Sequence, residues 1–128
     1  MKYILDTHLL LWAAGDPSQL SADANNLLSN KNNELFFSAA SLWEIAIKHS
    51  LGRGDFKVDA RLLRRGLLDN GYSELPISSE HAVAIDQLPE LHKDPFDRIL
   101  VAQATVEEIT LLTSDAFVVK YPGPIKKV

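Results

Sequence analysis

The chain has 128 residues, 46% of them hydrophobic, which is typical of a single domain with a buried core. It contains no cysteine, which excludes disulfide bonds and thiolate-bound metals and is consistent with a reducing cytoplasm. The net charge of −4 argues against indiscriminate binding to polyanions. No apolar run reaches the roughly 18 residues of a membrane span, and no signal-peptide pattern occurs at the start. We therefore expect one soluble, cytoplasmic domain over residues 1–128.

Basic residues are concentrated in one segment of this acidic chain. Residues 48–66 contain six Lys or Arg residues and only two Asp residues. The arginines Arg61, Arg64 and Arg65 recur on one side of an apolar helical stripe. They could contact RNA phosphates or a protein partner, or they could form a solvated helix face. The sequence leaves both interpretations open.

Apolar runs and turn signals predict an alternation of strands and helices along the chain. Strands are predicted at 2–5, 34–38, 72–77 and 110–113, with a further edge strand at 125–128. Helices are predicted at 7–14, 21–28, 39–50, 59–70, 79–88 and from 94 onward, with a short helical turn ending at 117 and a loop at 53–55. This alternation predicts an α/β protein whose parallel sheet is covered by helices on both faces.

The last long helix has an acidic entrance. Asp94 suits the N-cap, Pro95 suits the first helical position, and Asp97 ends the opening turn. The residues that follow are mostly apolar, so we expect a buried helix with Asp97 at its positive end.

Four acids are expected at one edge of the sheet. Asp6 and Asp115 each follow a predicted strand, and Glu44 and Asp97 each lie in the first turns of a helix entering from the same edge. Two like charges about 4 Å apart repel by roughly 4 kcal/mol at an effective dielectric constant of 20, so a cation should accompany them. Oxygen ligands without Cys or paired His favour Mg²⁺ or Mn²⁺. Such ions support phosphodiester hydrolysis.

Two of these acids also have the spacing of helix caps. Glu44 stands three residues after Ser41, and Asp97 stands three residues after Asp94, as in a capping box. Asp94 could also reach a metal through water, although an N-cap role is favoured. Spacing alone therefore does not distinguish a ligand from a cap.

The other two acids also have structural alternatives. Asp6 follows a buried strand and must be paired or bound to metal, so a partner such as Arg98 would account for it. Asp115 could cap the turn after the last long strand. Arg98 and Lys93 could instead steady a phosphate.

Several neighbouring side chains could support the acids or contact substrate. Hydroxyl groups that could hydrogen-bond a carboxylate or a metal-bound water belong to Thr7, Ser38 and Ser114. His8 and His92 could be general bases or phosphate contacts, or merely structural. Trp12 and Trp43 could stack on bases, but their helices look apolar and core packing is the favoured prediction.

Motifs over nearly the whole chain resemble PIN-domain ribonucleases, in particular the VapC-type toxins of bacterial toxin-antitoxin pairs. They are residues 5–12 (LDTHLLLW), 38–48 (SAASLWEIAIK), 94–98 (DPFDR), 102–104 (AQA) and 111–115 (LLTSD). The resemblance implies a three-layer α/β/α sandwich with a central, mostly parallel sheet of four to five strands. It also implies a metal-binding core of Asp6, Glu44 and Asp97, with Asp115 as the more variable fourth member.

The same resemblance implies endonucleolytic cleavage of RNA with Mg²⁺ or Mn²⁺, a homodimer, and a small VapB-like antitoxin protein. Two alternatives stay open. One is a catalytically silent PIN module that binds RNA or protein. The other is a phosphoacceptor signalling domain, which would need an aspartate ending a central strand and a lysine ending a late strand, and neither occurs where required.

Overall fold

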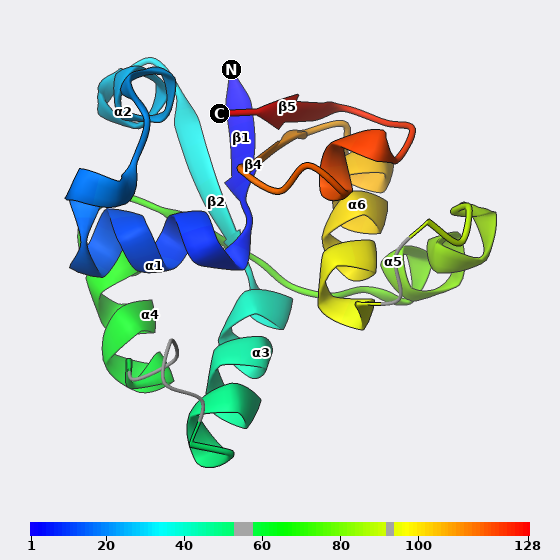
Figure 1. The fold of residues 1–128 in the computed structure, drawn as a ribbon, viewed down its shortest axis with the longest axis horizontal. Coiled ribbons are helices and arrows are strands. Elements are labelled where there is room, and N and C mark those ends of the chain that lie inside the picture. Colours follow the sequence, from blue (N-terminus) through cyan, green and yellow to red (C-terminus); the bar gives the residue numbers. More distant parts are fainter. Residues whose placement is uncertain (53–57, 92–93) are drawn as a thin grey trace.

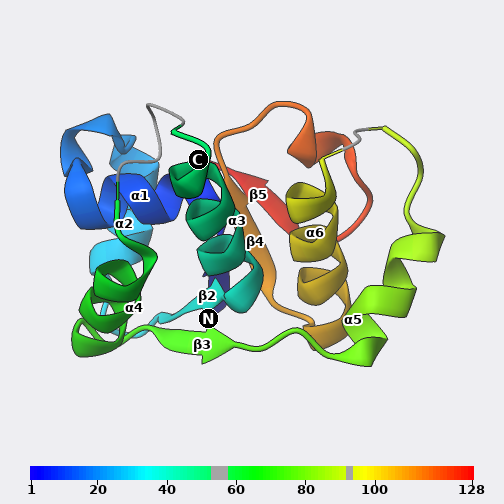
Figure 2. The same ribbon diagram turned by 90° about the horizontal axis from the view of Figure 1, so that it is seen from below.

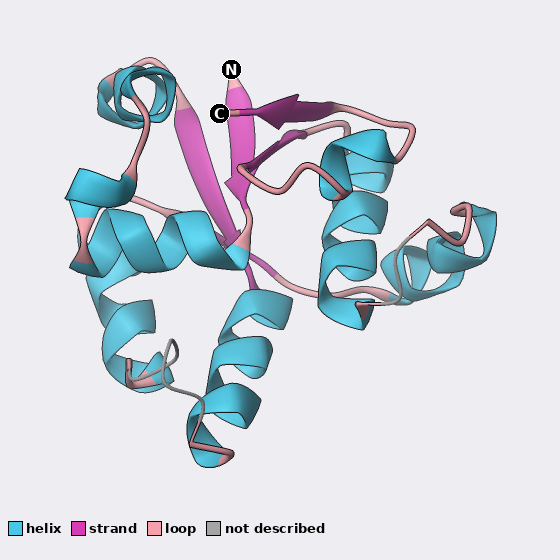
Figure 3. Ribbon diagram, viewed as in Figure 1, coloured by secondary structure: helices cyan, strands magenta, loops and turns pink. Residues whose placement is uncertain are grey.

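The computed structural model describes residues 1–52, 58–91 and 94–128. Within these residues, five parallel strands form one sheet in the order β3-β2-β1-β4-β5. Figure 3 shows the strands in magenta. The strands are β1 Lys2–Leu5, β2 Glu34–Ser38, β3 Ser73–Leu75, β4 Thr110–Thr113 and β5 Ile125–Lys127. The helices are α1 Thr7–Gly15, α2 Ala22–Ser29, α3 Ala39–Ser50, α4 Ala60–Asp69, α5 Ser79–Ala84 and α6 Pro95–Glu107. Short 3₁₀ turns occupy Pro17–Gln19, Ile85–Gln87 and Val118–Lys120.

Helices cover both faces of the sheet, as predicted. In Figure 1, α1, α2 and α4 lie on one side of the strands, and α5 and α6 lie on the other. Side chains of β1 alternate between these layers because successive residues of a strand point to opposite faces. Tyr3 and Leu5 pack in one core with α1 and α4 residues, and Ile4 packs in the other with α6 residues. The three-layer α/β/α architecture is therefore confirmed.

Helix α3 enters at the carboxyl edge of the sheet, below the strands in Figure 1 and between α4 and α6 in Figure 2. It contacts α1, α4 and α6. The side chain of Ser38 caps α3 by accepting a hydrogen bond from the backbone N–H of Ala40 at 3.0 Å. The alternative in which Ser41 and Glu44 form a capping box does not occur, because Ser41 lies inside the helix and is fully buried.

Some predicted boundaries differ from the observed ones. Strand β3 is shorter than predicted and stops before Pro76, which lacks the N–H that would continue a ladder. The predicted helix 79–88 is divided into α5 and a 3₁₀ turn, and the turn predicted to end at residue 117 continues as a 3₁₀ helix over Val118–Lys120.

Core packing was the wrong prediction for Trp43, whose side chain is 58% exposed, whereas Trp12 packs against the core. The predicted loop at 53–55 and the residues His92 and Lys93 lie outside the described residues. Over the described part of the chain, none of the helices has both the length and the apolar character needed to cross a bilayer.

Candidate active site

A cleft of about 400 Å³ lies at the carboxyl edge of the sheet. Carboxylates from four parts of the chain line it: Asp6, Glu44, Asp94, Asp97 and Asp115. The remaining described lining residues are Thr7, His8, Trp12, Lys48 and Ser114. The structure therefore brings the four acids singled out by the sequence to a common cleft, together with Asp94.

Asp6 is buried between the end of β1 and the start of α1. It is only 6% exposed and caps α1, accepting a hydrogen bond from the backbone N–H of Leu9 at 2.9 Å. The hydroxyl of Thr113 donates to its second oxygen at 2.5 Å. Burial raises the pKa of Asp6 above its ordinary value, although these two hydrogen bonds and His8 act in the opposite direction.

Two side chains each contact a different carboxylate oxygen of Glu44. The hydroxyl of Thr7 donates to Oε1 at 2.6 Å, and the ammonium of Lys48 lies 2.6 Å from Oε2. Glu44 is 5% exposed, so this contact with Lys48 pairs a nearly buried charge. Lys48 stands four residues after Glu44, a spacing that places both side chains on one helix face and could have revealed the pair in the sequence.

The entrance of α6 has the predicted cap. Asp94 Oδ1 accepts hydrogen bonds from the backbone N–H groups of Phe96 at 2.8 Å and Asp97 at 3.3 Å. Asp97 is half-buried in the first turn and lines the cleft. The N-cap prediction for Asp94 is confirmed, while its side chain still borders the cleft.

Asp115 and Arg98 have local partners. Asp115 accepts a hydrogen bond from the backbone N–H of Phe117 at 2.7 Å, as predicted for a cap of this turn. Arg98 donates to the carbonyl oxygens of Pro89 and Ile85, at 3.0 and 3.3 Å respectively. It thereby ties α6 to the segment after α5.

The predicted hydroxyl residues differ in their positions. Thr7 and Ser114 line the cleft, whereas fully buried Ser38 donates to Oε1 of Gln103 at 2.5 Å. Ser38 therefore joins α3 to α6. Thr113 is the supporting hydroxyl that sequence reasoning missed, because only its pairing with β1 brings it to Asp6, 107 residues away.

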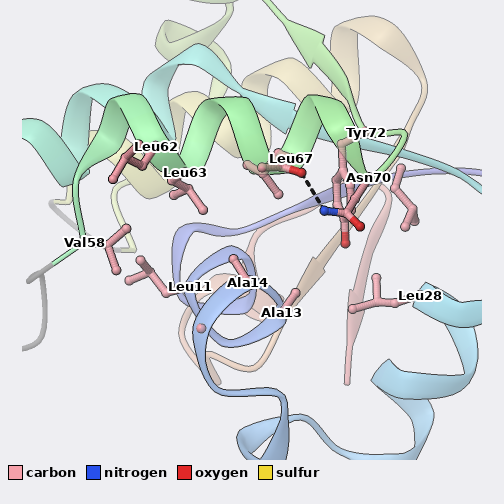
Figure 4. A pocket seen from close by; sticks show the side chains of 13 residues that line it. Leu11, Ala13, Ala14, Leu28, Val58, Leu62, Leu63, Leu67, Asn70 and Tyr72 are labelled. Atoms are coloured by element: carbon pink, nitrogen blue, oxygen red, sulfur yellow. Dashed lines mark hydrogen bonds between the residues drawn. The ribbon is translucent and has the colours of Figure 1, made fainter.

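The predicted basic surface lies on α4, beside another cavity. This cavity of about 660 Å³ is bordered by α1, α2 and α4 and is lined mainly by apolar side chains, including Leu11, Leu63 and Leu67 (Figure 4). Leu62 also borders it and is 67% exposed. The arginines of α4 are exposed, and Arg64 pairs with Glu74 at 3.1 Å.

The carboxylate oxygens of the cleft are the ligand type that Mg²⁺ and Mn²⁺ prefer, so the donor chemistry fits these ions. The described residues do not contain three His, Asp or Glu side chains grouped closely enough to hold an ion as they stand. Asp6 and Glu44 instead have protein donors, from Thr113, Thr7 and Lys48.

The fold and this acidic cleft define a three-layer α/β/α protein with a candidate hydrolytic site at its carboxyl edge. The PIN domain family model matches residues 3–122, so the chain belongs to the PIN domain family. No curated protein sequence matches the chain.

Solved structures of toxin-antitoxin complexes share the fold at low sequence identity. VapBC2 from Rickettsia felis, bound to a promoter DNA fragment, has a TM-score of 0.73 and 16% identity, covering 100% of this chain and 99% of that one. DNA-bound VapBC from Salmonella typhimurium has a TM-score of 0.65 and 16% identity, covering 99% and 98%. VapBC-1 from nontypeable Haemophilus influenzae has a TM-score of 0.62 and 18% identity, covering 94% and 91%.

Proposed function

We propose that this chain is a single PIN domain and a VapC-type toxin, a cytoplasmic endoribonuclease that depends on Mg²⁺ or Mn²⁺. The observation that carries the proposal is the gathering of Asp6, Glu44, Asp97 and Asp115 in one cleft of a PIN-family chain. These four carboxylates would hold the ion. When bound, the ion would supply a polarised water and charge stabilisation for phosphodiester hydrolysis.

The protein groups around the acids have defined tasks in this proposal. Thr113 and the backbone N–H of Leu9 orient the carboxylate of Asp6, and Thr7 orients that of Glu44. Lys48 neutralises Glu44, so two nearly buried acids can stay within one cleft. Thr7 and Ser114 present hydroxyl groups that can bind a water or a phosphate oxygen.

Cleavage of single-stranded RNA by the purified chain, freed of any partner protein, tests the proposal. Asp6→Asn and Asp97→Asn should each lower the cleavage rate more than about 100-fold. This is a larger loss than is usual when only a hydrogen-bond partner of a metal ligand is removed. Asp69→Asn, an exposed acid of α4, is the matched control and should cleave normally. Cleavage that persists in EDTA, or equal cleavage by Asp6→Asn and wild type, would overturn the proposal.

We further propose a small VapB-like antitoxin as partner, supported by the fold shared with toxins of VapBC complexes. The apolar cavity beside α4 suits it, because exposed Leu62 and Arg61 offer an apolar contact and a positive charge to an amphipathic, acidic segment. Leu62→Asp and Arg61→Glu should prevent co-purification with the protein encoded by the neighbouring gene and leave RNA cleavage intact. Unchanged co-purification would reject this surface.

A homodimer is also part of the proposal. It is supported by the resemblance of the motifs at residues 5–12, 38–48 and 94–98 to VapC-type toxins, which implies a homodimer. Sedimentation equilibrium should give twice the monomer mass. A catalytically silent PIN module would instead fail the cleavage assay while still binding RNA or protein.

A further inference from the structure

In the proposed function, the acidic cleft binds RNA, which is a polyanion, so it needs contacts that attract this substrate. Carboxylates make up half of its described lining, and Lys48 already lies 2.6 Å from Glu44. Electrostatic attraction from these side chains is therefore weak for a phosphodiester chain. Attraction that does not depend on charge can come from the nucleobases, which stack on aromatic rings regardless of sequence.

Two aromatic rings of α1 line this same cleft. Trp12 and His8 stand four residues apart and so share one helix face, with ring centroids 6.1 Å apart and planes inclined at 58°. Trp12 also packs against the core next to α1, which restricts its ring to few orientations. A ring held by packing loses little conformational entropy when a base stacks on it.

The position of Trp12 along α1 suits a nucleotide next to the reacting phosphate. Asp6 caps α1, and Trp12 lies six residues further on, about 9 Å along the helix axis. The cleft volume of about 400 Å³ is near the lower end of the roughly 300–1,000 Å³ typical of small-molecule sites. That space suits an unpaired nucleotide rather than a duplex.

We propose that Trp12, with His8 beside it, forms a base-stacking subsite that holds the nucleotide flanking the scissile phosphate of a single-stranded RNA. This inference rests on the proposed ribonuclease function and names the substrate contact of the same cleft. The other tryptophan differs in position. Trp43 makes an edge contact with Phe96, at 5.2 Å and 79°, and lies outside the cleft lining.

The test uses a single-stranded RNA oligonucleotide that the wild-type protein cleaves with Mn²⁺, after the cleaved bond has been mapped. Abasic ribonucleotides are placed in turn at the two positions on each side of that bond, and kcat/KM is measured for each substrate. For wild type, one abasic position should lower kcat/KM by about 5- to 150-fold, the range expected from stacking of one base.

Trp12→Leu, which retains an apolar side chain for the core, should cleave the intact and abasic substrates at equal rates, close to the wild-type rate on the abasic one. Trp12→Phe should keep most of the wild-type difference. Trp43→Leu is the matched control and should keep all of it. A merely structural role for Trp12 would lower both rates together and leave their ratio unchanged.

Two results would overturn the inference. One is a wild-type protein that cleaves all abasic substrates as fast as the intact one, and the other is a Trp12→Leu variant that retains the wild-type ratio. Either result leaves the ribonuclease function standing, because cleavage itself is still observed. Failure of the wild-type protein to cleave any RNA would overturn both proposals.

Discussion

Replacing Thr113 by Val tests how the structure holds a nearly buried carboxylate at the carboxyl edge. The Thr113 side chain is fully buried, donates to Asp6 at 2.5 Å and accepts from the backbone N–H of Asp115 at 3.0 Å. Valine has almost the same shape but lacks the hydroxyl group. A hydrogen bond to a charged group contributes about 1.5–3 kcal/mol, and a stranded donor adds to the cost. We expect Thr113→Val to lower the free energy of unfolding by about 2–4 kcal/mol near neutral pH.

The size of this loss should depend on pH through Asp6. Burial raises the pKa of Asp6 from its ordinary 3.8, so ionisation of Asp6 by itself destabilises the fold as pH rises through the folded pKa. The Thr113 hydrogen bond acts against this by stabilising the ionised form. Without it, the pKa of Asp6 rises further. The stability lost in Thr113→Val should therefore be small at a pH below the folded pKa of Asp6 in both the wild type and the variant, and should reach its full size at a pH above both.

Urea denaturation in EDTA at about pH 4 and about pH 8, followed by circular dichroism, measures this difference. The variant should lose about 1 kcal/mol at the lower pH and about 2–4 kcal/mol at the higher pH. Thr110→Val, at the other end of β4, is the control and should change stability by less than about 0.5 kcal/mol. A loss of equal size at both pH values would refute the idea that Thr113 supports the ionised carboxylate.

Substitutions at four further positions should give measurable results in the same denaturation assay. Lys48→Met should lower the free energy of unfolding by about 2 kcal/mol without metal, which is less than for a fully buried ion pair because Lys48 is 19% exposed. Added Mn²⁺ should recover part of this loss. An unchanged free energy of unfolding would show that Glu44 does not need Lys48. Gly71→Ala should destabilise the protein by about 1 kcal/mol because Gly71 has φ +86°. Gly66→Ala inside α4, where the new methyl group meets nothing within 4 Å, should stabilise it by a similar amount. Changes in the free energy of unfolding that have the same sign for both variants would contradict this reasoning. Asp94→Ala removes the cap of α6 and should lower the free energy of unfolding by about 1 kcal/mol, whereas Asp94→Asn should lower it much less. Equal losses for the two variants would argue against capping.

The sequence by itself determined the features that depend on neighbouring residues. Alternating apolar runs and turn signals predicted the strands β1, β2 and β4 and the helices between them, because secondary-structure periodicity is a local property. The caps at Asp94 and Asp115 were predictable for the same reason, since each side chain bonds a backbone N–H two residues further on. Acids placed directly after strands and at helix starts also predicted a common edge, given a parallel sheet.

Only the tertiary structure decided which groups meet across the fold. The sheet order β3-β2-β1-β4-β5 places Thr113 against Asp6, and the docking of α3 against α1 places Thr7 against Glu44. Such pairings join residues 107 and 37 positions apart, so a local pattern cannot specify them. The exposure of Trp43 also depends on tertiary structure, because a residue is buried only where another element covers it. The Trp43 side chain contacts Phe96 but remains 58% exposed.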